Sequence, residues 1–217
     1  MPLSKANLRS AQRHLRQADP VMRKIIDQVG PARLRAERNR FAMLVRSIIS
    51  QQISVGAARS IRKRLEALVA PGKLTPENLQ QFTPRQLRSA GLSQQKTSYI
   101  LDLARKTSHG EVVLRTIGRR SDEDVIQELT QVKGIGRWTA QMFLMFALGR
   151  PDVFPAADLG IRMAIRDQYN LDDLPDNQTS HEIAQPWHPY ATVASWYLWQ
   201  SIDMQRQKKN DNQDNPT

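Results

Sequence analysis

The chain has 217 residues, of which 40% are hydrophobic and none is cysteine, so it can build a packed core but excludes disulfides, cysteine-ligated clusters and thiol nucleophiles. The net charge is +11, and residues 1–66 carry all of the excess, with 15 Lys and Arg against 4 Asp and Glu, whereas residues 67–217 carry 17 of each. A cationic region of this kind favours a polyanionic partner through counterion release, although it equally fits a solubilising surface.

Apolar residues recur at helical spacing along most of the chain. The first clear stripe runs from Phe41 to Ile53, where apolar side chains every three or four positions predict a core-facing helix. Further helices are predicted at about 55–69, 76–81, 84–90, 94–107, 122–131, 137–148, 159–169 and 190–207. Thr75-Pro76 and Thr83-Pro84 place an N-cap before a first-turn proline. Because no segment alternates like a strand, the predicted fold is all-α.

Two stretches are predicted to lie outside helices. The acidic segment at 171–182 is expected to be a surface loop. The tail from about 207, within the string RQKKNDNQDNPT, lacks apolar residues and is expected to be disordered.

The strongest local signal is the string LTQVKGIGRWTA at residues 129–140. It predicts a helix, a turn with Gly134 and Gly136, and a second helix. Glycine lets a turn adopt positive φ and lets backbone approach a ligand closely, and the N–H groups at a helix start form a phosphate site. A bare Gly-x-Gly would fit an ordinary helix–helix turn equally well.

A second motif, VFPAADLGIR at residues 153–162, begins soon after this turn. The full hairpin string followed by this loop and Asp158 resembles the helix-hairpin-helix (HhH-GPD) DNA glycosylases, and most closely the AlkA-like 3-methyladenine glycosylases. Residues 49–54, the Gly91-Leu92-Ser93 turn followed by Lys96, and Gln185-Pro186-Trp187 with Tyr190 match the same family. The resemblance covers roughly residues 20–204.

The resemblance implies two helical domains with a DNA-binding cleft between them. Residues 40–150 would form a helical barrel domain that ends in the helix-hairpin-helix. Residues 1–39 and 151–217 would together form the second helical domain. A duplex containing a damaged base would be the partner.

In the family the hairpin holds duplex phosphates without reading sequence, and a side chain fills the gap left by an extruded base. By matching position, the expected DNA-binding residues are Gly134, Ile135, Gly136, Arg137 and Thr139 at the hairpin, and Gln51 and Gln52 as the wedge. For the two glutamines, a polar helix end is the alternative interpretation. A structural monovalent cation is expected on the main-chain carbonyls of Thr130, Val132 and Ile135, while catalysis needs no cofactor.

Asp158 matches the catalytic aspartate of the family. It also precedes a helical run and would make a good N-cap, and the two roles are compatible. Cleavage of an N-glycosidic bond builds positive charge on the sugar, which a nearby carboxylate stabilises while it orients water. A base alkylated at a ring nitrogen is already cationic and leaves without protonation, so no second acidic carboxylate is required.

A base taken out of the stack needs a pocket that stacks on it. Trp138 and Trp187 are the expected aromatic faces, with Met142 and Leu159 as walls, whereas Trp196 and Trp199 are expected to be core residues. Lyase-competent relatives carry a lysine two residues after the second hairpin glycine, where this chain has Trp138. The resemblance therefore implies a monofunctional enzyme without AP lyase activity.

The predicted function is base excision repair by hydrolysis of N-glycosidic bonds to alkylated purines of the 3-methyladenine and 7-methylguanine type. The alternatives are a glycosylase for hypoxanthine, uracil or an oxidised base, and a non-catalytic HhH DNA-binding protein. With no run of about 18 apolar residues and no signal-peptide core, we expect no membrane partner. The expected assembly is a monomer. It would be cytoplasmic, associated with the nucleoid in a bacterium or nuclear in a eukaryote.

Overall fold

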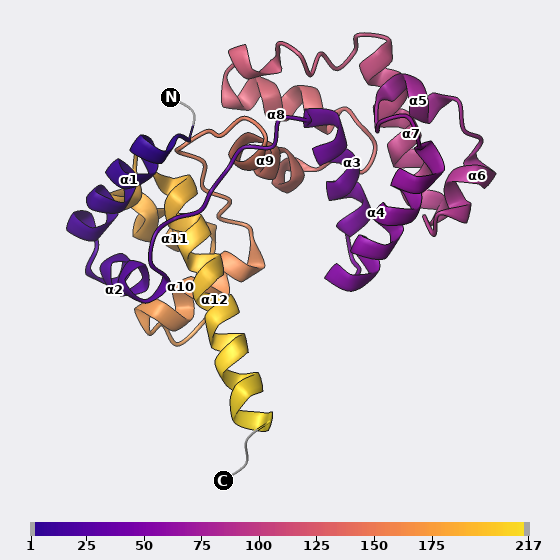
Figure 1. Ribbon diagram of the computed structural model, residues 1–217. Coiled ribbons are helices and arrows are strands. Elements are labelled where there is room, and N and C mark those ends of the chain that lie inside the picture. The colour runs from indigo at the N-terminus through magenta and orange to yellow at the C-terminus, as the bar shows by residue number, and fades with distance from the viewer. Residues whose placement is uncertain (1–2, 215–217) are drawn as a thin grey trace. The chain divides into compact units, whose positions relative to one another are not determined.

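The computed structural model describes residues 3–214, and within that range the predicted all-α class is confirmed because every regular element is a helix (Figure 1). None of the described helices combines the length and hydropathy needed to cross a bilayer. The chain divides into two compact units. Unit 1 comprises residues 1–36 and 149–217, and unit 2 comprises residues 37–148. The boundaries expected from the resemblance, 40 and 150, fall within three residues of these.

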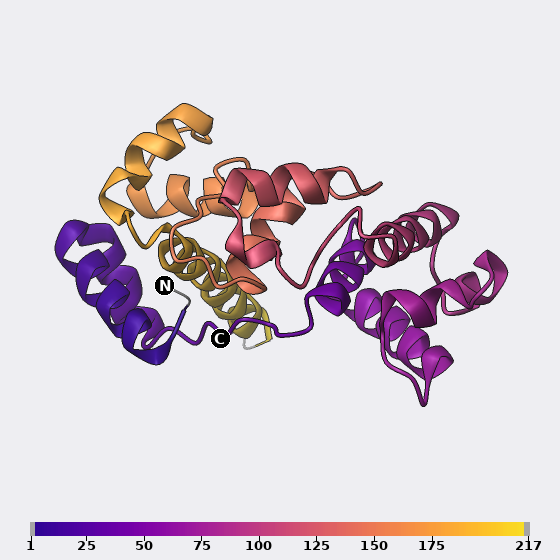
Figure 2. The same ribbon diagram turned by 90° about the horizontal axis from the view of Figure 1, so that it is seen from above.

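Unit 1 is built around its last helix, α12, which packs against α1, α2 and α10. Figure 2 shows α1 and α2 lying side by side. Its elements are α1 (Lys5–Ala18), α2 (Pro20–Val29), α10 (Leu159–Tyr169), α11 (Asn177–Ala184), a 3-10 turn (Gln185–Trp187) and α12 (Ala191–Asp214). Leu15, Ile25 and Val193 are among the side chains that fill its core.

Unit 2 contains the glycine hairpin, between α8 and α9. Its elements are α3 (Arg40–Ser50), α4 (Val55–Val69), α5 (Pro76–Gln80), α6 (Pro84–Ser89), α7 (Gln94–Ser108), a 3-10 turn (Ile117–Arg119), α8 (Asp122–Thr130) and α9 (Arg137–Phe146). The predicted N-caps are confirmed, because Thr75 and Thr83 accept hydrogen bonds from the third residues of α5 and α6. Leu44, Leu103 and Phe143 lie fully buried in its core.

The two segments predicted to be non-helical are largely helical in the structure. The acidic loop prediction for 171–182 is wrong from Asn177 onward, because Asp176 caps α11 by accepting the Thr179 N–H at 2.7 Å. The predicted disorder from 207 is also wrong, since α12 continues to Asp214. Gln, Arg and Lys are good helix formers, and adding them to an established helix avoids the cost of nucleation. Residues 215–217 of that predicted tail lie outside the described range.

The two N-terminal helices were not among the predicted ranges, although their signals are in the sequence. Leu8, Ala11 and Leu15 form a buried stripe along α1, and Ser4 caps it. Asp19 caps α2 and Pro20 occupies its first turn. Both patterns are standard start signals for helices.

Candidate functional site

The two hairpin glycines are required for different reasons. Gly134 has φ +78°, and a Cβ placed there would lie 2.0 Å from Cδ2 of the Tyr99 ring. Gly136 has φ −93° as the N-cap of α9, and a Cβ there would meet nothing within 4 Å. Packing inside the protein therefore explains Gly134 but leaves open space over Gly136, which is what close approach by an external group would need.

The N-terminus of α9 is a candidate anion site. No side chain caps it among the described residues, and the first helical hydrogen bond runs from Ala140 N–H to Gly136 C=O at 3.0 Å. The N–H groups of the preceding first turn have no acceptor within the helix, and the helix dipole adds positive potential there. Thr139, the third residue of α9, is buried.

The other two hairpin residues have clear structural roles. Ile135 is buried, and its N–H donates to the Val132 carbonyl at 3.1 Å, which closes the turn. Arg137 makes a two-pronged ion pair with Glu123 on α8, at 3.0 and 2.8 Å. The hydrogen bond from Arg137 holds the pKa of Glu123 below its usual value. Arg137 is exposed, so a phosphate would compete with Glu123 for it.

Three side chains of α7 contact the hairpin and fix its backbone. Tyr99 packs on Gly134, the Asp102 carboxylate accepts the Lys133 N–H at 2.9 Å, and the Lys106 ammonium donates to the Gln131 carbonyl. Burial alone would raise the pKa of Asp102, but the Lys133 N–H together with the nearby Lys106 and Arg105 outweighs it, so this pKa lies below its usual value. Sequence reasoning missed these positioning residues.

The loop after α3 separates the roles of the two glutamines. The Gln51 side chain is anchored, because its Nε2 donates to the Gly134 carbonyl at 2.8 Å. Lys96 Nζ donates to the carbonyls of Ile49 and Gln51 at 2.8 and 2.7 Å, which closes the end of α3. Gln52 is exposed and has φ 55°, a conformation rare outside glycine. Of the two candidates, Gln52 is therefore the one that projects.

Two apolar residues are exposed here, one in this loop and one at the start of α4, and the prediction that the core-facing stripe continues to Ile53 is wrong. Ile53 is 36% exposed and Val55 is 87% exposed. Because α3 ends at Ser50, Ile53 lies beyond the helix and does not continue its buried stripe; its exposure depends on how the loop is anchored.

Trp138 is an exposed aromatic face in the first turn of α9. Its side chain is 45% exposed, which is unusual for tryptophan, and Met142 lies one turn further along the helix with only 7% exposed. Unit 2 thus brings Trp138, the hairpin and the Gln52 loop together on neighbouring elements.

Asp158 is held in place by two N–H donors. Its Oδ1 accepts the Ile161 N–H at 2.8 Å, which makes it the N-cap of α10, and the Trp199 indole N–H at 3.0 Å. Trp199 is only partly buried and was expected to be a core residue, so the structure gives it a different role, in contact with the candidate carboxylate. Leu159 follows directly and is 58% exposed.

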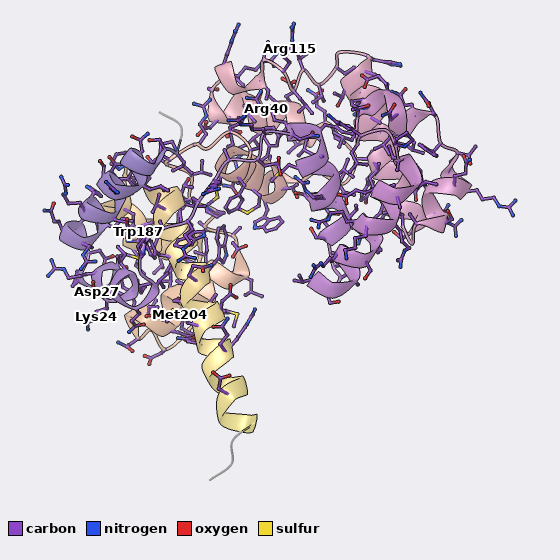
Figure 3. The ribbon with its side chains drawn as sticks, viewed as in Figure 1. Lys24, Asp27, Arg40, Arg115, Trp187 and Met204 are labelled. Atoms are coloured by element: carbon purple, nitrogen blue, oxygen red, sulfur yellow. The ribbon has the colours of Figure 1, made fainter. Side chains whose placement is uncertain are left out.

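The expectation that Trp187 lines a base pocket is corrected by the structure. Its side chain lies among the helices of unit 1 (Figure 3) and is fully buried, and its indole N–H donates to the buried Asp19 carboxylate at 2.9 Å. The ring meets Phe154 edge to face with centroids 5.5 Å apart. Stacking on a base would require this tryptophan to leave the core and would remove one of the donors to Asp19 Oδ2, which the Tyr169 hydroxyl also contacts, so Trp187 is a core residue.

No cluster of His, Asp or Glu suited to a metal ion occurs in the described part of the chain. The hairpin carbonyls of Thr130, Val132 and Ile135 are a donor set of a different kind, made of neutral oxygens. The Val132 carbonyl accepts the Ile135 N–H, but a carbonyl oxygen has two lone pairs and retains capacity for a cation.

Comparisons with known proteins point to one family. The family described as HhH-GPD superfamily base excision DNA repair protein matches residues 45–189. A solved 3-methyladenine DNA glycosylase of Schizosaccharomyces pombe, in complex with abasic DNA, is 32% identical and covers 89% of this chain and 97% of its own, with a TM-score of 0.82. The DNA-3-methyladenine glycosidase of Bacillus halodurans is 34% identical over 88% of each chain, with a TM-score of 0.78. A Bacillus subtilis relative is 34% identical to this chain. The matched region covers 74% of this chain and 58% of the relative's length.

Proposed function

Because the chain belongs to the HhH-GPD superfamily of base excision DNA repair proteins, we propose that it is a monofunctional DNA glycosylase that removes alkylated purines from duplex DNA. The observation that carries the proposal is the fixed carboxylate of Asp158, held at Oδ1 by the Ile161 N–H and the Trp199 indole. Its proposed partner is a duplex containing a damaged base, bound by one copy of the chain.

The proposed chemistry is hydrolysis of the N-glycosidic bond. As the bond breaks, positive charge develops on the deoxyribose, and a carboxylate whose orientation is already fixed stabilises that charge without reorganising. The same carboxylate orients the attacking water. A purine alkylated at a ring nitrogen carries the positive charge in the ground state and leaves as a neutral base, so the reaction needs no general acid.

The proposed DNA grip lies at the hairpin. Open space over Gly136 and the uncapped start of α9 support a phosphate site at the main-chain N–H groups of residues 137–139. We propose that the carbonyls of Thr130, Val132 and Ile135 hold a monovalent cation, which would add positive charge beside that phosphate. Arg137 would contribute after exchanging Glu123 for a phosphate oxygen.

The proposed base contact in unit 2 is the exposed indole of Trp138, with Met142 one turn further along α9; in unit 1 the exposed Leu159, next to Asp158, is a separate apolar candidate. The electron-rich face of an indole attracts a cationic base, which favours alkylated purines over neutral ones. Gln52, exposed and projecting, is the proposed wedge that fills the gap left in the duplex. Trp187 has no part in this pocket.

The decisive experiment compares two N-cap aspartates in the same unit. Asp158→Asn is expected to abolish release of methylated bases from alkylated duplex DNA, while duplex affinity changes by less than about threefold, because asparagine also caps helices well. Asp176→Asn, at the cap of α11, is the matched control and should leave both unchanged. Released bases are scored by identity, so excision of hypoxanthine, uracil or an oxidised base instead would replace the proposed substrate. Near-normal turnover by Asp158→Asn would overturn the mechanism.

The monofunctional character is tested separately. The position where lyase-competent relatives have lysine holds Trp138, so the product should be an intact abasic strand. We expect no strand cleavage until alkali is added, and no covalent complex trapped by borohydride. A trapped complex would show that some other amine attacks the sugar.

A further inference from the structure

A pocket of about 400 Å³ between α3 and α4 has a strongly cationic lining. Three guanidinium groups line it, from Arg46 on α3 and from Arg59 and Arg62 on α4. The hydroxyl-bearing Ser47 and Ser50 complete its polar side. Neither the catalytic carboxylate nor the hairpin contributes to it.

The guanidinium donors in this pocket exceed the acceptors that the protein supplies. Arg46 has an ion-pair partner, Glu37, at 2.6 Å. Arg62 Nε lies 3.7 Å from Glu66, too far for a hydrogen bond, and this buried nitrogen has no hydrogen-bond partner. Arg59 is exposed and makes no hydrogen bond or ion pair within residues 3–214. The Arg62 side chain as a whole is 40% exposed, so its terminal N–H groups, like those of Arg59, are open to an acceptor from a ligand.

Two other arginines of unit 2 have hydrogen-bond acceptors within the protein. Arg40, labelled in Figure 3, donates to the carbonyls of Leu114 and Arg115 at 2.6 and 3.0 Å. Arg64 donates through Nε to the Ala90 carbonyl at 2.8 Å. These two side chains hold unit 2 together, whereas Arg59 and Arg62 have donors available on the surface.

The pocket adjoins the proposed DNA contacts within the same unit. Its walls include Ser50 and Val55, which stand on either side of the loop that carries Gln52. Gln51 in that loop is hydrogen-bonded to the hairpin at Gly134. A duplex bound at the proposed hairpin and wedge sites would therefore have its backbone close to these arginines.

We propose that the α3–α4 pocket binds a backbone phosphate of the duplex, distinct from the phosphate at the start of α9. This proposal rests on the proposed function, because the occupant is DNA. A guanidinium fork matches phosphate oxygens with two parallel hydrogen bonds, and Arg59 and Arg62 are spaced three residues apart on one face of α4, as a shared ligand requires. The contact carries no sequence information and acts by fixing the duplex beside the wedge.

The first test measures duplex affinity as a function of salt. Each phosphate contact contributes a slope of about 0.9 in log K against log salt concentration, so Arg59→Ala/Arg62→Ala should lower the slope by about 1 to 2. Arg115→Ala/Arg119→Ala, at two exposed arginines of the same unit, removes equal charge and should leave the slope nearly unchanged. Arg59→Ala alone is included because its side chain has no partner to lose, so its folding should not change.

The second test locates the contact on the DNA. Single neutral methylphosphonates are placed at successive positions along each strand, and affinity is measured for the wild type and for Arg59→Ala/Arg62→Ala. The wild type should be weakened at two separate groups of positions, and the double variant should lose its sensitivity at one group only. The remaining group, from the hairpin, shows that DNA binding itself is intact.

The outcomes separate this proposal from the function on which it rests. If the wild type excises bases and is sensitive at the hairpin positions, but the double variant has the same slope and the same methylphosphonate profile, the pocket proposal is overturned and the glycosylase remains. If inorganic phosphate perturbs the NMR signals of the arginine side chains while the methylphosphonate profile is unchanged, the pocket binds a free anion and the proposal is likewise overturned. If the wild type binds no duplex, the proposed function fails first.

Discussion

Gly134 and Gly136 should respond in opposite ways to the same added methyl group. At Gly134 an alanine would adopt a left-handed conformation and overlap the Tyr99 ring at 2.0 Å. The backbone term costs about 1–2 kcal/mol and overpacking about 1–3 kcal/mol, so Gly134→Ala should destabilise the protein by about 2–5 kcal/mol. At Gly136 both terms are absent, and the change in stability should stay within about 1 kcal/mol.

DNA binding should reverse this order. If a phosphate approaches the backbone at the start of α9, the methyl group of Gly136→Ala blocks it, and affinity for damaged and undamaged duplexes should fall about tenfold or more. This loss corresponds to about 1.4 kcal/mol, the scale of one hydrogen bond to a charged group. Gly134→Ala should bind with less change at temperatures where it stays folded.

Thermal melting and fluorescence anisotropy, both at one salt concentration, measure the two effects. The melting temperature of Gly134→Ala should fall by roughly 4 to 20 °C, and Tyr99→Ala in the same chain should restore part of it by removing the overlap. A Gly136→Ala protein that binds duplex normally would refute the inference of close backbone approach. A Gly134→Ala protein as stable as the wild type would refute the packing argument.

Three further outcomes follow from other contacts. Trp199→Phe removes the indole N–H that donates to Asp158, a hydrogen bond worth about 1.5–3 kcal/mol. Single-turnover excision should therefore slow about 10- to 150-fold while duplex affinity stays unchanged. An equal loss of affinity would contradict a positioning role for Trp199. Trp138→Ala should reduce excision of 7-methylguanine about thirtyfold, which corresponds to about 2 kcal/mol of cation–π attraction. This loss should exceed the loss of duplex affinity, and circular dichroism checks that the helices remain folded. The contacts of the Asp102 carboxylate stabilise the fold above its unfolded pKa of about 3.9, and this stability is lost as the pH falls through its lowered folded pKa. Asp102→Asn should therefore weaken the pH dependence of the melting temperature between roughly pH 5 and pH 2. An unchanged pH dependence would show that other groups provide the acid-sensitive stability.

Local signals predicted the parts of the molecule that depend on local physics. The helices of unit 2 follow from apolar spacing and from threonine caps, and Asp158 was predicted as an N-cap because its neighbours in sequence decide that role. Gly134 and Gly136 were recognised as a hairpin, but the packing reason for Gly134 depends on Tyr99, more than thirty positions earlier in the chain.

The two tryptophans that changed roles show where sequence reasoning stops. Trp187 was expected in the pocket and lies in the core, whereas Trp199 was expected in the core and contacts Asp158. The sequence neighbours of an indole do not show which acceptor its N–H will meet in the fold. The difference arises from distant partners, since Asp19 receives the Trp187 N–H and Asp158 receives that of Trp199.

The contacts along α7 have a geometric consequence. Lys96 fixes the carbonyls before Gln52, while Asp102 and Lys106 fix the hairpin, so one rigid helix determines how far apart these two sites stand. Lys106 lies ten positions after Lys96 on this helix, which corresponds to about 15 Å at about 1.5 Å per residue. Inserting a single residue between Lys96 and Asp102 would turn one group of contacts by about 100° relative to the other. The length of this segment is therefore as constrained as the identity of any side chain on it, although none of its residues needs to touch DNA.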